Sequence, residues 1–332
     1  MRSAKIHKNL GAEERRHAKV LPSVPILESN NIEPPTTFRD GQGNSKMEMI
    51  TAIVLGIIQG LTEFLPVSSS AHLILVPWLC GWNPEGLVFD VSLHVGTAIA
   101  LLAYFWRDWI LLAREVVTGI AAGNLSGNAR RRLGWYLVIG TLPAMGVGLA
   151  LENYVESRFR SPLISVFTLV AFALLLYYAE RRGKRGRPLD RIRLADSLWI
   201  GASQALALIP GVSRSGITIS AGLLRDFDRS SAARFSFLLS TPVIVGAGLL
   251  QVWHLVKTVR RPALATAAGL LTGPGDIKWS ILAAGVASSM IVGFLCIRYF
   301  LRYIQKNSLM PFVIYRILLA LLVLVMYLRH GA

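Results

Sequence analysis

The chain has 332 residues, of which 53% are hydrophobic and 16% are charged, and its formal net charge is +16. Soluble domains carry about 25% charged residues, so this balance argues against a soluble globular protein and favours a lipid environment. The basic charge does not indicate nucleic-acid binding, because Lys and Arg cluster in short segments between apolar runs. In that position they set membrane topology and contact anionic lipid.

Residues 1–46 mix Lys, Arg, Glu, Asn, Pro and Gly and contain no apolar run, so we expect no signal-peptide core. Such a segment cannot bury enough surface to order itself, and we predict a disordered tail. Met47 and Met49 stand directly before the first apolar run. One hypothesis is that translation begins there, ahead of a single integral membrane domain at 47–332.

Several apolar runs approach or reach the roughly 20 residues that an α-helix needs to cross a bilayer. They are Leu87–Trp106, Leu133–Leu151, Leu163–Ala179, Phe237–Val256, Ile281–Phe300 and Phe312–Leu328. We therefore predict an all-α polytopic membrane protein with about six transmembrane helices. The segment 181–193 is rich in Lys and Arg and marks the cytoplasmic side.

Two interrupted apolar segments, Gly56–His72 and Gly201–Thr218, resemble each other at a constant offset, because Gln204 follows Gln59 by 145 positions and Ser213 follows Ser68 by 145. A proline interrupts each segment, and a Ser-rich turn follows. We predict two pairs of re-entrant or broken helices in an inverted repeat, with halves at about 47–180 and 195–332. Such paired interruptions point to a binding site within the membrane. An ordinary Pro-kinked spanning helix in each half is the alternative.

Each predicted break opens a new helix at a serine, which is a favoured N-cap residue. The unpaired N–H groups and positive dipole end of such a helix form a ready anion site. Two such ends facing each other would hold a strongly negative ligand.

Gln59 and Glu63 lie one helical turn apart, so they share a helix face. A carboxylate in an apolar run is costly and indicates a functional residue, although a purely structural ion pair is the alternative. Carboxylate and amide oxygens suit a hard cation such as Mg²⁺ or Ca²⁺.

His72 follows Ser69 by three residues and Ser68 by four, a spacing that allows a nucleophile beside a general base. The alternative, a core histidine bonded to the backbone, is equally compatible with this spacing. For His94, which lies in the apolar run 87–106, a simple interfacial position is slightly favoured over a role in the site.

Arg214 lies between Ser213 and Ser215, and this arrangement predicts a phosphate clamp at a helix N-terminus. Thr218, one turn further on, adds a donor. An arginine that reaches to the membrane interface is the less favoured alternative.

Residues 60–72 (GLTEFLPVSSSAH) and 210–218 (PGVSRSGIT) resemble the two signature regions of the bacterial undecaprenyl-diphosphate phosphatase family, also called the bacitracin-resistance family. The likeness continues through 89–97, 235–242 and 311–316. It implies hydrolysis of undecaprenyl diphosphate to undecaprenyl phosphate and inorganic phosphate. That reaction recycles the lipid carrier of peptidoglycan and other cell-wall synthesis and confers bacitracin resistance.

The resemblance also implies a location in the bacterial inner membrane, with the site facing the periplasm, and a bound divalent cation, Mg²⁺ or Ca²⁺. It implies roles for the matching residues: catalytic His72, Ser69, Glu63 and Arg214; substrate-binding Ser68, Ser70, Ser213, Ser215 and Thr218; metal-binding Glu63 and Gln59. Many members carry Glu where this chain has Gln59, which leaves the metal preference open. Pairing into a homodimer is an open alternative to a monomer.

A transporter or flippase of undecaprenyl phosphate or a related anionic lipid is the rival function, because inverted repeats with central anion sites also occur in transporters. His72 beside Ser69 discriminates between the two, since transport requires an anion clamp and no nucleophile. A membrane scaffold without chemistry ranks last, because it gives no reason for Glu63 or Arg214.

Overall fold

The computed structural model describes residues 45–82, 87–159, 161–184, 186–259 and 279–329. The tail predicted at 1–46 therefore lies almost wholly outside the described residues. Within them, regular structure is helical apart from one isolated bridge between Arg187 and Phe227. An all-helical architecture is compatible with a lipid environment, because each helix satisfies its own backbone hydrogen bonds.

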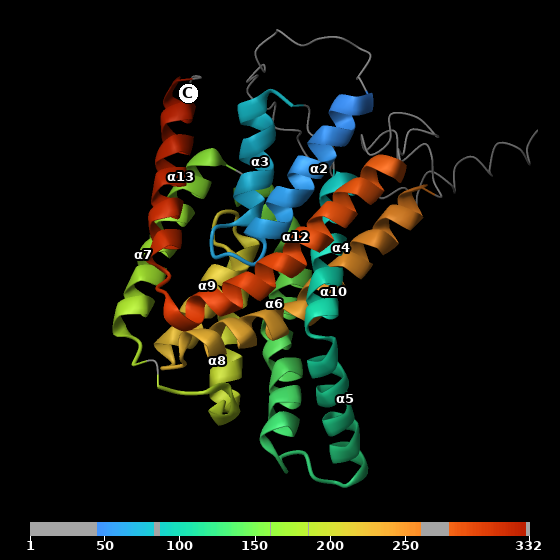
Figure 1. Ribbon diagram of the computed structural model, residues 1–332, viewed down its shortest axis with the longest axis vertical. Coiled ribbons are helices and arrows are strands. Elements are labelled where there is room, and N and C mark those ends of the chain that lie inside the picture. Colours follow the sequence, from blue (N-terminus) through green and yellow to red (C-terminus); the bar gives the residue numbers. More distant parts are fainter. Residues whose placement is uncertain (1–44, 83–86, 160, 185, 260–278, 330–332) are drawn as a thin grey trace, which may run out of the picture. The chain divides into compact units, whose positions relative to one another are not determined.

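The helices are labelled in Figure 1. Their bounds are α2 Ser45–Thr62, α3 Ser69–Cys80, α4 Leu87–Tyr104, α5 Trp106–Ala121, α6 Ala129–Phe159, α7 Pro162–Arg182, η2 Leu189–Arg191, α8 Leu194–Gln204, η3 Ala205–Leu208, α9 Arg214–Leu224, α10 Arg229–Val259, α12 Trp279–Lys306 and α13 Met310–Arg329.

Five of the predicted spans are confirmed as long apolar helices, within α6, α7, α10, α12 and α13. The span predicted at Leu87–Trp106 is different, because α4 ends at Tyr104 and the chain turns by 71° into α5. Arg107 and Asp108 follow the bend directly, and both are exposed or half-buried. The sixth crossing is therefore a bent pair of helices, and the fold is that of an all-α polytopic membrane protein.

Helix α10 begins eight residues earlier than the apolar run suggests, at Arg229. Asp228 explains the start, since its carboxylate accepts hydrogen bonds from the backbone N–H (2.8 Å) and the hydroxyl (2.7 Å) of Ser231. This is the geometry of a helix N-cap. A polar cap thus extends the helix beyond its hydrophobic stretch.

The order of helices recurs along the chain at roughly the spacing of the sequence repeat. Helices α2, α3, α4, α6 and α7 are followed in the same order by α8, α9, α10, α12 and α13. In Figure 1, α2 and α3 lie in the upper part of the view and α8 lies in the lower part. The two interrupted segments meet between them, where the Ser215 hydroxyl donates to the Leu65 carbonyl at 2.9 Å.

Each broken helix packs against a long helix from the other half of the chain. Helix α8 lies against α6, and α2 lies against α12. A Cβ at Gly201 of α8 would overlap the carbonyl oxygen of Gly140, and a Cβ at Gly56 of α2 would lie 2.6 Å from the carbonyl oxygen of Gly285. Small residues permit such close helix approach in membranes. Both glycine pairs are related by the same offset of 145 residues.

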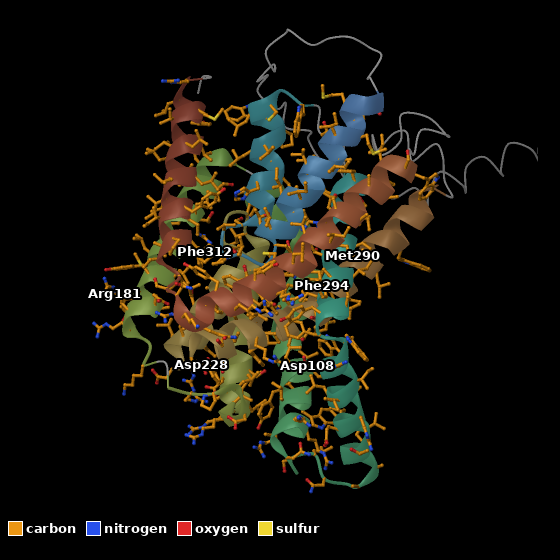
Figure 2. The ribbon with its side chains drawn as sticks, in the orientation of Figure 1. Asp108, Arg181, Asp228, Met290, Phe294 and Phe312 are labelled. Atoms are coloured by element: carbon orange, nitrogen blue, oxygen red, sulfur yellow. The ribbon has the colours of Figure 1, made fainter. Side chains whose placement is uncertain are left out.

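Charged side chains gather in the lower part of Figure 2, where Arg181, Asp228 and Asp108 are labelled. Apolar side chains dominate the middle, and many of them are exposed on the helix surfaces, such as Phe167 and Leu149, each at 72%. Exposed apolar surface on this scale marks contact with a membrane.

Candidate active site

Both interrupted segments place a serine in the same unusual backbone conformation. Ser68 has φ 77° and Ser213 has φ 69°, and each is the N-cap of the helix that follows the break. Positive φ at a residue other than glycine costs roughly 1–3 kcal/mol and persists where the surroundings enforce it. Such positions cluster at functional sites, and here the two meet in the centre of the fold.

Arg316 is the residue that enforces both breaks. Its side chain is 0% exposed and lies on α13. The guanidinium donates hydrogen bonds to backbone carbonyls of both breaks and of α7: Pro66 (3.3 Å), Gly211 (2.9 Å), Val212 (3.0 Å), Leu169 (3.3 Å) and Thr168 (3.5 Å). Carbonyls that the helix breaks leave unpaired are thereby satisfied inside the protein, as a non-helical backbone at membrane depth requires.

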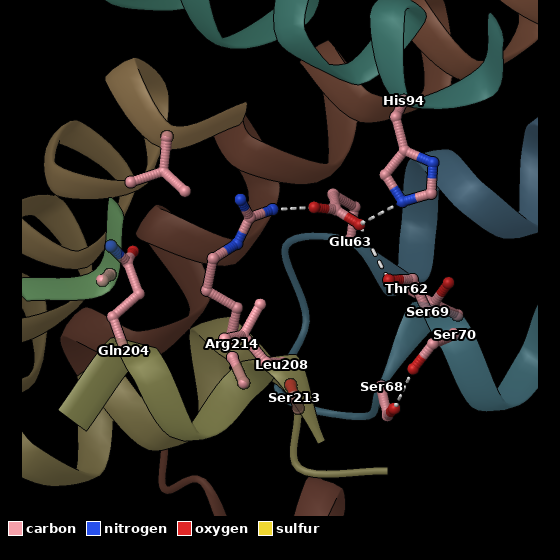
Figure 3. A pocket seen from close by; sticks show the side chains of 13 residues that line it. Thr62, Glu63, Ser68, Ser69, Ser70, His94, Gln204, Leu208, Ser213 and Arg214 are labelled. Atoms are coloured by element: carbon pink, nitrogen blue, oxygen red, sulfur yellow. Dashed lines mark hydrogen bonds and ion pairs between the residues drawn. The ribbon is translucent and has the colours of Figure 1, made fainter. Parts of the chain in front are cut away.

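Glu63 is the hub of the site, as Figure 3 shows. Its Oε2 accepts from the amide of Gln59 at 2.9 Å and from the hydroxyl of Ser69 at 2.7 Å. Its Oε1 accepts from the guanidinium of Arg214 on the second break. His94 of α4 places Nε2 3.9 Å from Oε2. One carboxylate thus joins a hydroxyl from the first break to a cation from the second.

A pocket of about 230 Å³ opens beside this cluster. The side chains that line it are Thr62, Glu63, Ser68, Ser69, Ser70, His94, Ala144, Gln204, Ala207, Leu208, Ser213, Arg214 and Val243. The lining includes hydroxyls, a carboxylate and a guanidinium as well as the alkyl groups of Ala144, Leu208 and Val243. The pocket suits a ligand with an anionic head and an apolar tail.

The predicted binding residues divide into two groups. Ser68, Ser70 and Ser213 line the pocket, and their substrate-binding role stays a prediction. Ser215 and Thr218 do not, because they are 4% and 0% exposed and bond to protein atoms. Thr218 contacts the carbonyl of Arg214 at 2.7 Å and the Ser236 hydroxyl at 2.6 Å. Their geometry is that of residues that support the turn.

His72 does not contact the hydroxyl of Ser68 or Ser69 in this structure. Its Nδ1 lies 2.7 Å from the backbone carbonyl of Ser68, and its Nε2 lies 2.6 Å from the Tyr315 hydroxyl. The ring also stacks on Tyr315, with centroids 5.6 Å apart. The expected Ser69–His72 pair is therefore replaced by a Ser69–Glu63 pair, and the catalytic role of His72 stays a prediction.

A divalent cation finds few protein ligands here. Within the described ranges, no group of three or more His, Cys, Asp and Glu side chains lies close enough to hold a metal ion. Glu63 offers its carboxylate, and Gln59 offers Oε1, which is buried and has no partner within those ranges. Mg²⁺ is commonly held by one or two carboxylates together with substrate phosphates and water. Glu63 and Gln59 therefore fit a cation that shares its ligands with a bound phosphate.

Two site features were not predicted from the sequence. For His94 an interfacial position was slightly favoured over a role in the site, but this residue lines the pocket and faces Glu63. Arg316 was not singled out, although a lone charge inside the apolar run of α13 is itself a signal of function. Both act through contacts with segments distant in the chain, which local patterns do not display.

Comparison with known proteins gives a consistent result. Residues 52–322 match the family described as bacitracin resistance protein BacA. A relative from Desulforudis audaxviator, named undecaprenyl-diphosphatase, is 48% identical over 285 residues, which is 86% of this chain and 100% of the relative.

Relatives from Moorella thermoacetica and Geobacter sulfurreducens carry the same name. The first is 46% identical over 86% of this chain and 100% of its own length. The second is 48% identical over 82% of this chain and 96% of its own length. With the family match covering both breaks and every residue of the pocket, this chain belongs to the bacitracin resistance protein BacA family.

Proposed function

We propose that this protein hydrolyses undecaprenyl diphosphate to undecaprenyl phosphate and inorganic phosphate. The observation that carries the proposal is the Glu63 carboxylate, which contacts both the Ser69 hydroxyl and the Arg214 guanidinium. The relatives named undecaprenyl-diphosphatase support the substrate. The product recycles the lipid carrier of cell-wall synthesis, which accounts for a link to bacitracin resistance.

The first step is binding of the terminal phosphate between the two breaks. Arg214 is paired with Glu63 in this structure, and a phosphate is a stronger bidentate partner for its guanidinium. When the phosphate takes Arg214, the Glu63 carboxylate is released from the guanidinium, and its Oε2 still accepts the hydrogen bond from Ser69. Ser69 already donates to Glu63 at 2.7 Å, so its proton is the one that moves.

In the covalent route, Ser69 Oγ forms a bond to the terminal phosphorus while the bond from that phosphorus to the bridging oxygen breaks. The lipid monophosphate leaves with the bridging electron pair, and Glu63 takes the serine proton and passes it to the oxygen of the leaving monophosphate. Water then attacks the phosphorus of the phosphoserine while Glu63 takes a proton from it. The bond from phosphorus to Ser69 Oγ breaks, that oxygen regains a proton from Glu63, and inorganic phosphate leaves. In the alternative route, Ser69 orients a water that Glu63 deprotonates, and that water attacks phosphorus directly. Both routes rely on positioning and charge stabilisation, as phosphoryl transfer does generally.

A divalent cation, Mg²⁺ or Ca²⁺, belongs to the proposal, with Glu63 and Gln59 as its protein ligands. Bound there together with the diphosphate, it would neutralise phosphate charge. The residues of this chain then bind the substrate through Arg214 and orient the Ser69 hydroxyl.

The pocket is proposed to open on the periplasmic side. The basic segment near Arg181 marks the cytoplasmic end of the helices. Val243 follows Arg229, the first residue of α10 at that end, by 14 residues, or about 21 Å of helix. His94 follows the start of α4, at the opposite end, by only seven residues, or about 10 Å. These lengths support a site nearer the opposite face.

Transport of an anionic lipid is the less favoured function. An anion clamp for transport would need Arg214 and the helix N-termini but gives no role to a serine hydroxyl hydrogen-bonded to a carboxylate. Membrane lipids surround the helices in either case. Association into a homodimer is a separate proposal.

The test is phosphate release from undecaprenyl diphosphate by detergent-purified protein, with Mg²⁺ or Ca²⁺ and again with EDTA. We expect cation-dependent release by the wild type and a loss of at least about 10²-fold in Glu63→Gln, since that variant removes the proton acceptor. Glu115→Gln is the matched control, because Glu115 pairs with Arg131 near the loop that joins α5 to α6. Release that persists in Glu63→Gln would overturn the mechanism, and none from folded wild type would overturn the function.

A further inference from the structure

Gln204, the last residue of α8, has a buried amide that finds no partner within the described part of the chain. The residue is 3% exposed and lines the pocket. Neither its Oε1 nor its Nε2 has a hydrogen-bond partner among the described residues. Gln59, which precedes it by 145 positions, instead donates its Nε2 to Glu63.

An unpartnered buried amide is costly, and buried polar side chains are almost always hydrogen-bonded. Gln204 lines the pocket and its amide atoms are buried behind the pocket wall, so a ligand there can satisfy the amide after a local shift of this side chain. The cost of the free state is then recovered when the ligand binds. This is the arrangement of a binding residue rather than of a residue that stabilises the fold.

The position of Gln204 indicates which part of the ligand it meets. In Figure 3 Gln204 lies on the side of Arg214 opposite Glu63 and Ser69. The pocket wall also includes the alkyl groups of Ala144, Val243 and Leu208. A diphosphate with its terminal phosphorus at Ser69 and its first phosphate beyond Arg214 would place that phosphate at the Gln204 amide.

We infer that Gln204 binds the lipid-proximal phosphate, with its amide N–H donating to a phosphate oxygen. It is thus a specificity residue that distinguishes a lipid diphosphate from a single phosphate group. The inference rests on the proposed phosphatase function and adds to it a residue for the part of the substrate that does not react. Ser69 and Glu63 act on the terminal phosphorus, and Gln204 recognises the lipid-proximal phosphate, which does not react.

The test uses Gln204→Leu, which keeps the side chain's approximate volume and removes both polar atoms. Farnesyl diphosphate serves as the substrate, and inorganic phosphate serves as an inhibitor that occupies only the terminal-phosphate position. We expect KM for farnesyl diphosphate to rise about 10- to 100-fold, as for a lost hydrogen bond to a charged group, with kcat within a few-fold. The inhibition constant of inorganic phosphate should stay within about two-fold, and the Tm in detergent should not fall.

Ser203→Ala is the matched control, because Ser203 is the neighbour on α8 and its hydroxyl donates to the carbonyl of Ile200 in its own helix. An unchanged KM in Gln204→Leu would overturn the inference while leaving the phosphatase intact. Equal weakening of farnesyl diphosphate and inorganic phosphate would overturn the assignment to the proximal phosphate. A lowered Tm would assign Gln204 a structural role. Wild-type protein that releases no phosphate would instead sink the proposed function itself.

Discussion

The two interrupted segments have nearly the same backbone conformation at the break but carry different functional groups. Ser68 and Ser213 have nearly the same φ, and the residues that follow them, Ser69 and Arg214, occupy equivalent first positions of a helix. At this equivalent position one segment carries a hydroxyl and the other a guanidinium. A repeated scaffold thus supplies two copies of one turn, and divergence at single positions supplies different functional groups.

The same division holds one turn before each break. Glu63 precedes the first break, and the position 145 residues later is Leu208, which also lines the pocket. The first segment is therefore anionic and the second cationic, and the ion pair between Glu63 and Arg214 joins them across the centre. A phosphate that enters between them meets a cation and a proton acceptor from different halves of the chain.

The largest expected effect is on kcat, and it tests the catalytic role of the first interrupted segment. Ser69→Ala should lower kcat about 10²- to 10⁴-fold, because its hydroxyl is the group that contacts Glu63. His72→Ala should lower kcat less than about tenfold, because its ring bonds the Ser68 carbonyl and Tyr315 instead. The measurement is steady-state phosphate release from undecaprenyl diphosphate.

Equal losses in Ser69→Ala and His72→Ala would contradict this division and restore His72 as the general base. Trapping of a phosphorylated Ser69 after acid quench would select the covalent route. In that experiment Ser70→Ala serves as the control, because Ser70 lines the same pocket and its hydroxyl contacts Ser68 rather than Glu63.

The sequence was sufficient for the long spans, the two breaks and the set of polar residues around them, since these rest on local hydropathy, proline and an internal repeat. It did not reveal which atoms pair. The Ser69–His72 spacing and the Ser69–Glu63 contact are both compatible with the sequence, and only the turn at Ser68 decides between them. The contact of His94 with Glu63 joins segments that are distant in the chain, so the local hydropathy pattern cannot predict it.

The second prediction tests whether one residue holds both segments. Arg316→Met keeps an unbranched side chain but leaves buried carbonyls at both breaks without a donor. We expect a loss of at least about 3 kcal/mol in the free energy of unfolding, from several unsatisfied groups at about 1–3 kcal/mol each. Chemical denaturation in detergent micelles measures it.

Arg302→Met on α12 is the matched control, because Arg302 is exposed, and its stability should change by less than about 0.5 kcal/mol. If Arg316→Met were as stable as Arg302→Met, the carbonyls of the two breaks would have another source of hydrogen bonds.

The smallest expected effect compares the close helix crossings of the two halves. Gly56→Ala and Gly201→Ala each add a methyl group where a neighbouring backbone carbonyl leaves no room. Each should reduce the free energy of unfolding by about 1–3 kcal/mol through overpacking. Gly146→Ala on α6 has open space around it and should instead match or slightly exceed wild-type stability. A neutral effect at only one of the two glycines would show that the crossings are not equivalent.

The packing of α2 against α12 has a consequence for how the protein is made. Helix α2 leaves the ribosome more than two hundred residues before α12, and Arg316, which satisfies the carbonyl of Pro66, is synthesised later still. Until then the first break has unpaired carbonyls inside the bilayer, which lipid does not tolerate. We therefore expect the first break to reach its final conformation only after α13 has been made. The donor that the first break requires thus comes from a helix of the other half of the chain.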